Sequence, residues 1–263
     1  MEQTDDFHTL RAMLEWQLDL GATEAIGDVA VNRYDLAERG QVVAAPVAAP
    51  VAAPVAAPVA APAGPSLVAD TAGPAAEAGD LAGLRAAIAA FDGCDLKQGA
   101  RSLVFADGNP NARVMVLGEA PGREEDQQGL PFVGPAGQML DRMFAAIGLS
   151  RRASDPEKAL YITNILPWRP PQNRDPTPEE IAMFMPFVAR HVELVNPKVL
   201  ILMGNIPCMG VLGQRGITRL RGQWATALDR PVLPMFHPAY LLRNPAAKRE
   251  AWADLLALKA RLT

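Results

Sequence analysis

Residues 113–122 read RVMVLGEAPG, a short apolar strand that runs directly into a glycine-rich turn. Similar apolar runs recur three times further along the chain, and helical stretches separate them. Strands that alternate with helices predict an α/β fold in which a parallel sheet is covered by helices on both faces. The predicted strands are Arg113–Leu117, Tyr161–Leu166, Val199–Met203 and Val232–Phe236.

The helices between these strands carry local start signals. One helix is predicted over Ala136–Ile147. Another begins at Thr177-Pro-Glu-Glu180, where threonine is the N-cap, proline occupies the first helical position and Glu180 completes a capping box. That helix is predicted to end near Leu194, and Asn244-Pro245 caps a last helix that contains Trp252 and Leu255.

The first 80 residues have a different composition. The sequence VAAP occurs five times in 43–62, and Pro/Ala/Gly-rich sequence continues to about residue 80. Proline at every fourth position excludes helix and sheet ladders, so 41–80 is predicted to be an extended, semi-rigid linker. Residues 1–40 are predicted to hold one amphipathic helix near 8–20, which either docks on the main domain or recruits a protein partner. The main domain is predicted over 81–263.

Composition places few constraints on function. The chain has 263 residues and a net charge of −4, and proline interrupts every long apolar run. Met1–His8 is acidic, unlike a signal peptide, and two cysteines cannot form a disulfide framework. We therefore expect a cytoplasmic protein without a membrane segment, and we expect a monomer.

Charge is distributed unevenly along the chain. Residues 1–90 carry 4 basic and 12 acidic side chains, whereas residues 213–263 carry 9 basic and 3 acidic ones. A basic C-terminal quarter is compatible with binding to a polyanion, but charge alone favours an ordinary solvated helix face.

Several common enzyme classes lack support. The sequence has no GxGxxG motif after a strand, no GxxxxGK[ST] loop and no GxSxG elbow. The three histidines, His8, His191 and His237, do not have the spacing of zinc ligands.

Polar residues instead follow the predicted strands. The turn Gly118–Gly122 follows the first strand, Asn164 lies within the second, and His237 follows the last. Because ligands bind outside the carboxyl ends of parallel strands, these residues are expected to line one site. Each of them, taken singly, also has an ordinary structural explanation as core, cap or turn.

Five segments of the main domain resemble the family 4 uracil-DNA glycosylases in order and spacing, across nearly all of 94–262. The segments are GEAPGREED at 118–126, GLPFVGPAG at 129–137, YITN at 161–164, RPPQNRDPTPEE at 169–180 and HPAYLLRNP at 237–245. The resemblance implies a three-layer α/β/α sandwich with a central four-stranded parallel sheet. It also implies excision of uracil from DNA, with uracil-containing DNA as the partner.

The family's roles carry over to matching positions. Phe132 would stack on a flipped uracil, Asn164 would read its polar edge, and His237 would stabilise charge at uracil O2. Glu119 would position water, since Ala120 stands where faster relatives in the superfamily carry an aspartate. The turn residues implied to line the base pocket are Gly118, Ala120, Gly122 and Glu125. The residues implied to contact DNA are Arg169, Arg174, Leu241, Leu242 and Arg243.

The sequence departs from the family at its cofactor. Family 4 members normally hold a four-iron four-sulfur cluster through four cysteines, and only Cys94 remains here. The other three ligand positions hold Phe91, Trp168 and Phe184. One thiolate cannot hold such a cluster, so we predict that no cluster or other metal is bound and that apolar packing takes its place. This departure leaves two alternatives open, a DNA-binding or scaffold protein with little turnover, and a glycosylase for another deaminated base.

Overall fold

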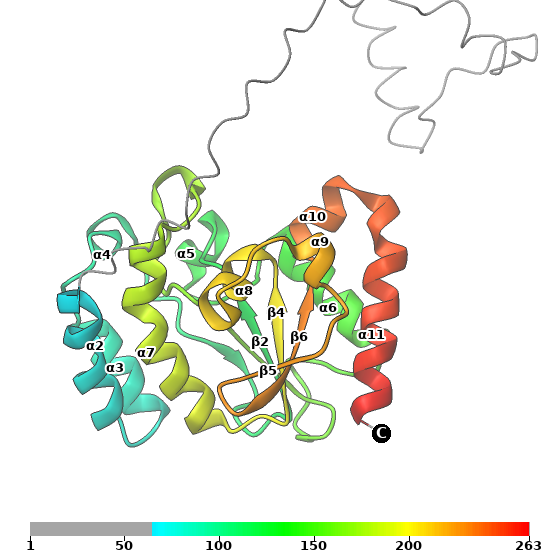
Figure 1. Cartoon of the computed structure of the whole chain (residues 1–263), viewed down its shortest axis with the longest axis horizontal. Coiled ribbons are helices and arrows are strands. Elements are labelled where there is room, and N and C mark those ends of the chain that lie inside the picture. The colour runs from blue at the N-terminus through cyan, green and yellow to red at the C-terminus, as the bar shows by residue number, and fades with distance from the viewer. Residues whose placement is uncertain (1–64, 263) are drawn as a thin grey trace, which may run out of the picture. The chain divides into compact units, whose positions relative to one another are not determined.

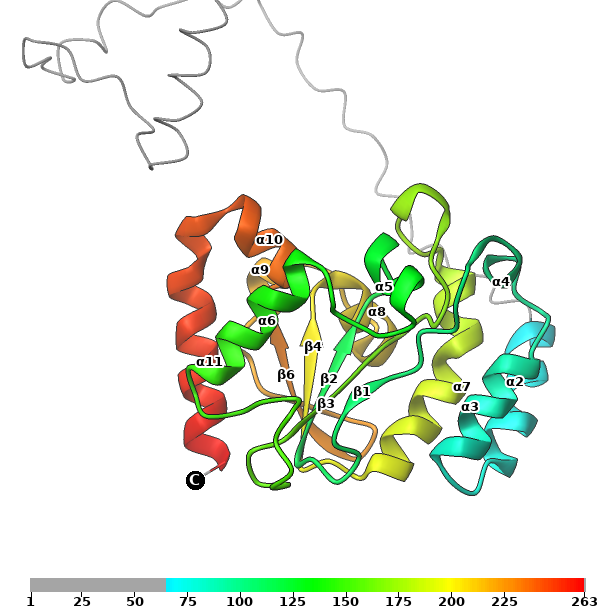
Figure 2. The ribbon, with the colours of Figure 1, turned by 180° about the vertical axis from the view of Figure 1, so that it is seen from behind.

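The computed structural model of the chain describes residues 65–262, with side chains from Asp70 onward. Its centre is a six-stranded sheet in the order β1-β3-β2-β4-β6-β5, with helices on either side (Figures 1 and 2). The strands are β1 (Asp107–Gly108), β2 (Val114–Gly118), β3 (Leu160–Asn164), β4 (Val199–Met203), β5 (Ala225–Ala227) and β6 (Arg230–Met235).

The helices cover both faces of this sheet. Those before β3 are α2 (Pro65–Glu77), α3 (Leu81–Ala90), α4 (Leu96–Gly99), α5 (Arg123–Gln128) and α6 (Pro135–Ala145). Those after β3 are the 3-10 helix η2 (Pro171–Asn173), α7 (Pro178–Val195), α8 (Asn205–Leu212), α9 (Ile217–Leu220), α10 (Pro238–Arg243), the 3-10 helix η3 (Pro245–Ala247) and α11 (Lys248–Leu262).

Alternate residues of each central strand pack into two separate apolar cores. Met115 and Leu117 of β2 join the core beneath α2, α3, α7 and α8, whereas Val114 and Val116 join the core beneath α6, α10 and α11. Successive side chains of a strand point to opposite faces, so a strand buried on both faces is apolar throughout. This is the α/β arrangement predicted from the apolar runs, and Figure 1 shows α7 and α11 on opposite sides of the sheet.

The predicted four-stranded sheet is two strands too narrow. Strands β3, β2, β4 and β6 pair in parallel, but β1 and β5 add antiparallel edges. These edge strands have two and three residues, too short for an alternating pattern to reveal.

The predicted linker over 41–80 is wrong for its last part, because residues 65–77 form helix α2. The Thr71 hydroxyl donates to the Met183 carbonyl of α7 at 2.9 Å, and Ala75 is buried. Proline at position 65 is tolerated in a first helical turn, and the repeating prolines end before it. Residues 41–64 and the predicted helix near 8–20 lie outside the described residues. The predicted docking of that helix, or its recruitment of a partner, therefore stays a prediction.

The predicted start of the helix at Thr177 is confirmed. The Thr177 hydroxyl accepts from the Glu180 N–H at 3.2 Å, and the Glu180 carboxylate accepts from the Thr177 N–H at 2.8 Å. Helix α7 therefore begins where the capping box indicates. Over residues 65–262, none of the helices is long and apolar enough to cross a membrane.

Candidate functional site: a cavity at the carboxyl ends of the central strands

A cavity of about 390 Å³ opens at the carboxyl ends of β2, β3 and β6. It is lined by Glu119, Ala120, Pro121, Gly122, Glu125, Phe132, Ala136, Asn164, Pro170, Asn173, Arg174, Asp175, His237, Ala239 and Arg243. The parallel register explains this convergence, since Gly118 at the end of β2 is paired with Asn164 at the end of β3.

Gly118 forms the floor on which two predicted site residues meet. A Cβ atom at this position would lie 2.3 Å from Asn164 Oδ1 and 2.5 Å from Cε2 of Phe132. Only glycine therefore lets the amide and the ring close over the end of β2. Asn164 is 7% exposed, and within residues 65–262 its side-chain amide has no hydrogen-bond partner. A buried amide of this kind normally finds a partner, so one facing a cavity is available to a ligand.

His237 completes the group. Its ring centroid lies 5.5 Å from that of Phe132, and its Nδ1 accepts from the Ala239 N–H at 3.2 Å. Burial lowers the pKa of His237, the positive charge of Arg243 lowers it as well and Glu125 opposes them, and together they place this pKa at about 4. The ring is therefore neutral near pH 7, and because Nδ1 is an acceptor, the proton is on Nε2. His237 thus offers one N–H donor to a ligand.

Glu119 follows Gly118 on the same rim. Burial raises the pKa of Glu119, Asp175 raises it as well and Arg215 lowers it, and together they place this pKa at about 7. The residue also lines a second cavity of about 320 Å³ that extends toward Arg215 and Tyr240. A carboxyl group that titrates near neutrality can accept a proton from water at physiological pH.

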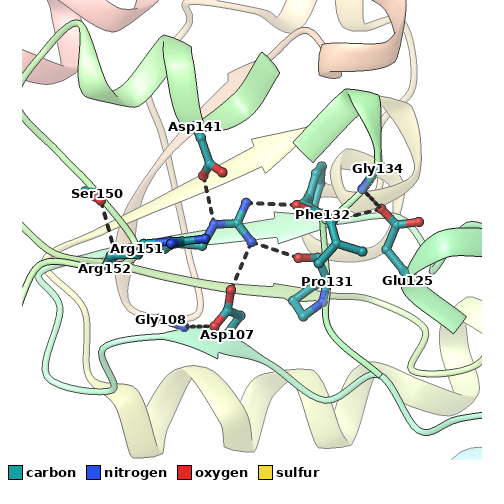
Figure 3. Close-up of polar contacts among 11 residues, drawn as sticks. Asp107, Gly108, Glu125, Pro131, Phe132, Gly134, Asp141, Ser150, Arg151 and Arg152 are labelled. Atoms are coloured by element: carbon teal, nitrogen blue, oxygen red, sulfur yellow. Dashed lines mark hydrogen bonds and ion pairs between the residues drawn. The ribbon is translucent and has the colours of Figure 1, made fainter. Parts of the chain in front are cut away.

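The turn that carries Phe132 is held from two sides. Phe132 has a φ of 53°, in the left-handed region that a bulky residue rarely adopts. The Glu125 carboxylate accepts from the N–H groups of Val133 and Gly134, both at 3.0 Å. Arg151 donates to the carbonyls of Pro131 and Phe132 (Figure 3). Sequence reasoning included Glu125 but missed Arg151, which lies outside every motif and has no local signal.

Only some of the residues predicted to contact DNA line the cavity. Arg174 and Arg243 line the cavity, although the Arg174 guanidinium is already paired with Glu180 at 2.6 Å. Arg169 does not line it and donates to Asn173 at 2.8 Å. Leu242 is 41% exposed, but Leu241 is fully buried where α10 packs against α6. Leu241 therefore packs inside the protein in this structure, and its contact with DNA stays a prediction.

Residues 105–256 match the family described as the uracil DNA glycosylase superfamily. The chain belongs to this superfamily. It is 37% identical to a type-4 uracil-DNA glycosylase of Archaeoglobus fulgidus over 172 residues, which are 61% of this chain and 82% of that protein. It is 39% identical over 154 residues to the type-4 enzyme of Thermotoga maritima, covering 57% and 77% of the two chains. A type-5 uracil-DNA glycosylase of Pyrobaculum aerophilum is 30% identical over 149 residues, with 52% and 66% covered.

The iron–sulfur cluster of family 4 does not fit the side chains of this superfamily member. Cys94 is buried, but the rings of Phe91 and Phe184 meet edge to face with centroids 6.0 Å apart. The ring centroid of Phe187 lies 6.0 Å from that of Phe91, and Trp168 is buried in the same core. None of these aromatic side chains has a thiolate for iron. In the part of the chain that the structure describes, no three His, Cys, Asp or Glu side chains gather to hold a metal.

Proposed function

We propose that this protein is a DNA repair glycosylase that flips uracil out of DNA and cleaves its N-glycosidic bond, which leaves an abasic site. The observation that carries the proposal is the meeting of Phe132, Asn164 and His237 at one cavity. The names of the type-4 relatives support the same activity.

Each of the three side chains suits one part of the reaction. Uracil inside a duplex is inaccessible, and flipping it out costs roughly a few kcal/mol. Stacking on the Phe132 ring offsets about 1–3 kcal/mol of that cost. The Asn164 amide can donate to a uracil carbonyl and accept from N3–H, whereas cytosine presents the reverse pattern and is disfavoured.

Bond cleavage leaves a uracil anion, and the neutral His237 ring supplies a donor for it. The Nε2–H group of His237 is free to donate because Nδ1 is already bonded to the Ala239 N–H. A donor aimed at developing charge in a dry site contributes about 3–4 kcal/mol to the transition state. Glu119 then accepts a proton from the attacking water, which takes over part of the role that Ala120 cannot fill.

Uracil release from a labelled oligonucleotide tests this proposal. The full chain should convert uracil-containing DNA to abasic DNA, and His237→Ala should lower the rate per folded molecule about 100-fold or more. Loss of the bond to the Ala239 N–H should lower the free energy of unfolding by only about 1 kcal/mol. His8→Ala serves as the histidine control and should retain the rate. Salt-dependent DNA binding without base release by folded protein would favour the scaffold alternative, and release of hypoxanthine or xanthine in preference to uracil would favour another deaminated base.

We also propose that this member works without the family's cluster, because aromatic side chains occupy three of the four ligand positions. Protein purified without oxygen should be colourless and should contain less than about 0.1 iron per chain by metal analysis. A stoichiometric iron signal that disappears in Cys94→Ala would show that the alignment at Phe91, Trp168 and Phe184 is wrong.

We further propose that the protein acts in the cytoplasm as a monomer. Light scattering coupled to size exclusion should return the mass of one chain, 28.1 kDa. A mass of two chains at micromolar concentration would contradict the monomer.

A further inference from the structure

Phe132, the aromatic residue that lines the cavity, has an unfavourable backbone conformation. Phe132 has a φ of 53°, and unlike the glycines with positive φ, it carries a large side chain. Such a conformation persists only where the surroundings impose it, and it often coincides with a functional position. The contacts around residues 131–134 must therefore supply what the local sequence does not.

Arg151 supplies most of the contacts to the carbonyl side of this turn. Its Nη1 donates to the Pro131 carbonyl at 2.9 Å and its Nη2 to the Phe132 carbonyl at 3.0 Å. Two carboxylates orient the same guanidinium, Asp141 of α6 at 2.8 Å on Nε and Asp107 of β1 at 3.0 Å on Nη1 (Figure 3). The Arg151 side chain is only 7% exposed.

The N–H groups of the turn are held by a negatively charged side chain, whereas the positively charged Arg151 binds its carbonyls. The Glu125 carboxylate accepts from the Val133 and Gly134 N–H groups. Gly137 makes room behind, since a Cβ there would lie 1.7 Å from the Phe132 carbonyl oxygen. A cation thus binds the carbonyls and an anion binds the amides of one short turn, which fixes its direction as well as its position.

We propose that Arg151 is a positioning residue that holds the Phe132 ring against the base, and this inference rests on the proposed function. Arg151 does not line the cavity and is surrounded by two carboxylates, so it does not serve as a phosphate contact. Arginine suits the role because its planar fork serves several acceptors in fixed directions, whereas a lysine ammonium cannot reproduce that geometry.

A double-mutant cycle with Phe132 tests the proposal. Arg151→Ala should lower kcat/KM for uracil release about 100-fold, the cost expected when a reacting group is misplaced by about 1 Å. In a Phe132→Ala background the same change should lower it less than about threefold, because the ring that Arg151 positions is already gone. Equal losses in both backgrounds would overturn the proposal, since a general structural role predicts additive effects.

Arg190→Ala is the matched control. Arg190 also joins a backbone carbonyl, that of the buried Ala78 between α2 and α3 at 2.8 Å, to a carboxylate, that of Glu193 of α7 at 2.8 Å, but none of the three residues lines the cavity. It should leave kcat/KM within about twofold. If Arg151→Ala does not fold, Asp141→Ala removes one orienting carboxylate and should show a smaller loss with the same dependence on Phe132. A loss from Asp141→Ala that persists in the Phe132→Ala background would overturn the proposal as well.

A structural readout separates this inference from the proposed function. In a crystal structure of Arg151→Ala or Asp141→Ala, Phe132 should leave the left-handed region or its ring should move away from His237. An unchanged turn would overturn the inference even if the wild type releases uracil. Conversely, a displaced turn in a protein that releases no uracil would support the positioning role of Arg151 and contradict the proposed function.

Discussion

The base cavity and the aromatic cluster of Phe91, Trp168, Phe184 and Phe187 hold their neighbouring segments by opposite physical means. In the cavity, the Phe132 turn is held by directed hydrogen bonds to Arg151 and Glu125. In the cluster, the rings of Phe91, Phe184 and Phe187 meet at centroid separations of 6.0–6.1 Å. The first arrangement is polar and directional, and the second is apolar and depends on volume.

This difference shows which regions tolerate a change of chemistry. A base must be contacted at defined atoms, so the cavity depends on particular donors and acceptors at particular positions. A packed core only has to exclude water and fill its volume, so aromatic rings can replace another group of similar size there. Substitutions in the two regions should therefore separate stability from activity.

Phe184→Ala should have the largest effect, and the effect should be on stability. Phe184 is 1% exposed and contacts the Phe91 and Phe187 rings, so truncation should lower the free energy of unfolding by about 3–5 kcal/mol in urea titrations. The rate of uracil release per folded molecule should change by less than about threefold. Phe184→Leu, which retains most of the volume, should cost less than half as much; equal losses from both would show that packing volume is not the cause.

Asn164→Ala should have the opposite profile. Its amide faces the cavity without a partner among residues 65–262, so its loss should leave the melting temperature within a few degrees. The value of kcat/KM for uracil release should fall about 100-fold, because both contacts to the base edge are lost. Single-turnover kinetics on the same oligonucleotide give the measurement. A melting temperature that falls together with activity would place Asn164 in a structural role.

Glu119→Gln should have the smallest effect and should appear in the pH profile. A base with a pKa of about 7 is mostly protonated at pH 6 and mostly ionised at pH 8, so the wild-type rate should rise about tenfold across that interval. The variant should be slower and flat over the same range. His237, with a pKa of about 4, stays neutral throughout and adds no limb. A variant that retains the rise would assign it to another group.

Local pattern in the sequence was sufficient for the central strands, for the start of α7 and for the idea that the strand ends share one site. Apolar runs of five residues report burial on both faces, and the capping box at Thr177 is complete within four residues. Glu119, Asn164 and His237 lie at or directly beyond the ends of predicted strands, whereas Phe132 was indicated only by the resemblance of the segment GLPFVGPAG at 129–137.

Only the tertiary structure decided the features that depend on contacts between distant segments. The edge strands are too short to show a pattern, and α2 is defined by its packing on α7 rather than by its own sequence. Leu241 is buried because α10 rests on α6, and Arg151 reaches the Phe132 carbonyl from nineteen positions away. Such contacts depend on the relative placement of elements in three dimensions, and residue type and local spacing carry no record of that placement.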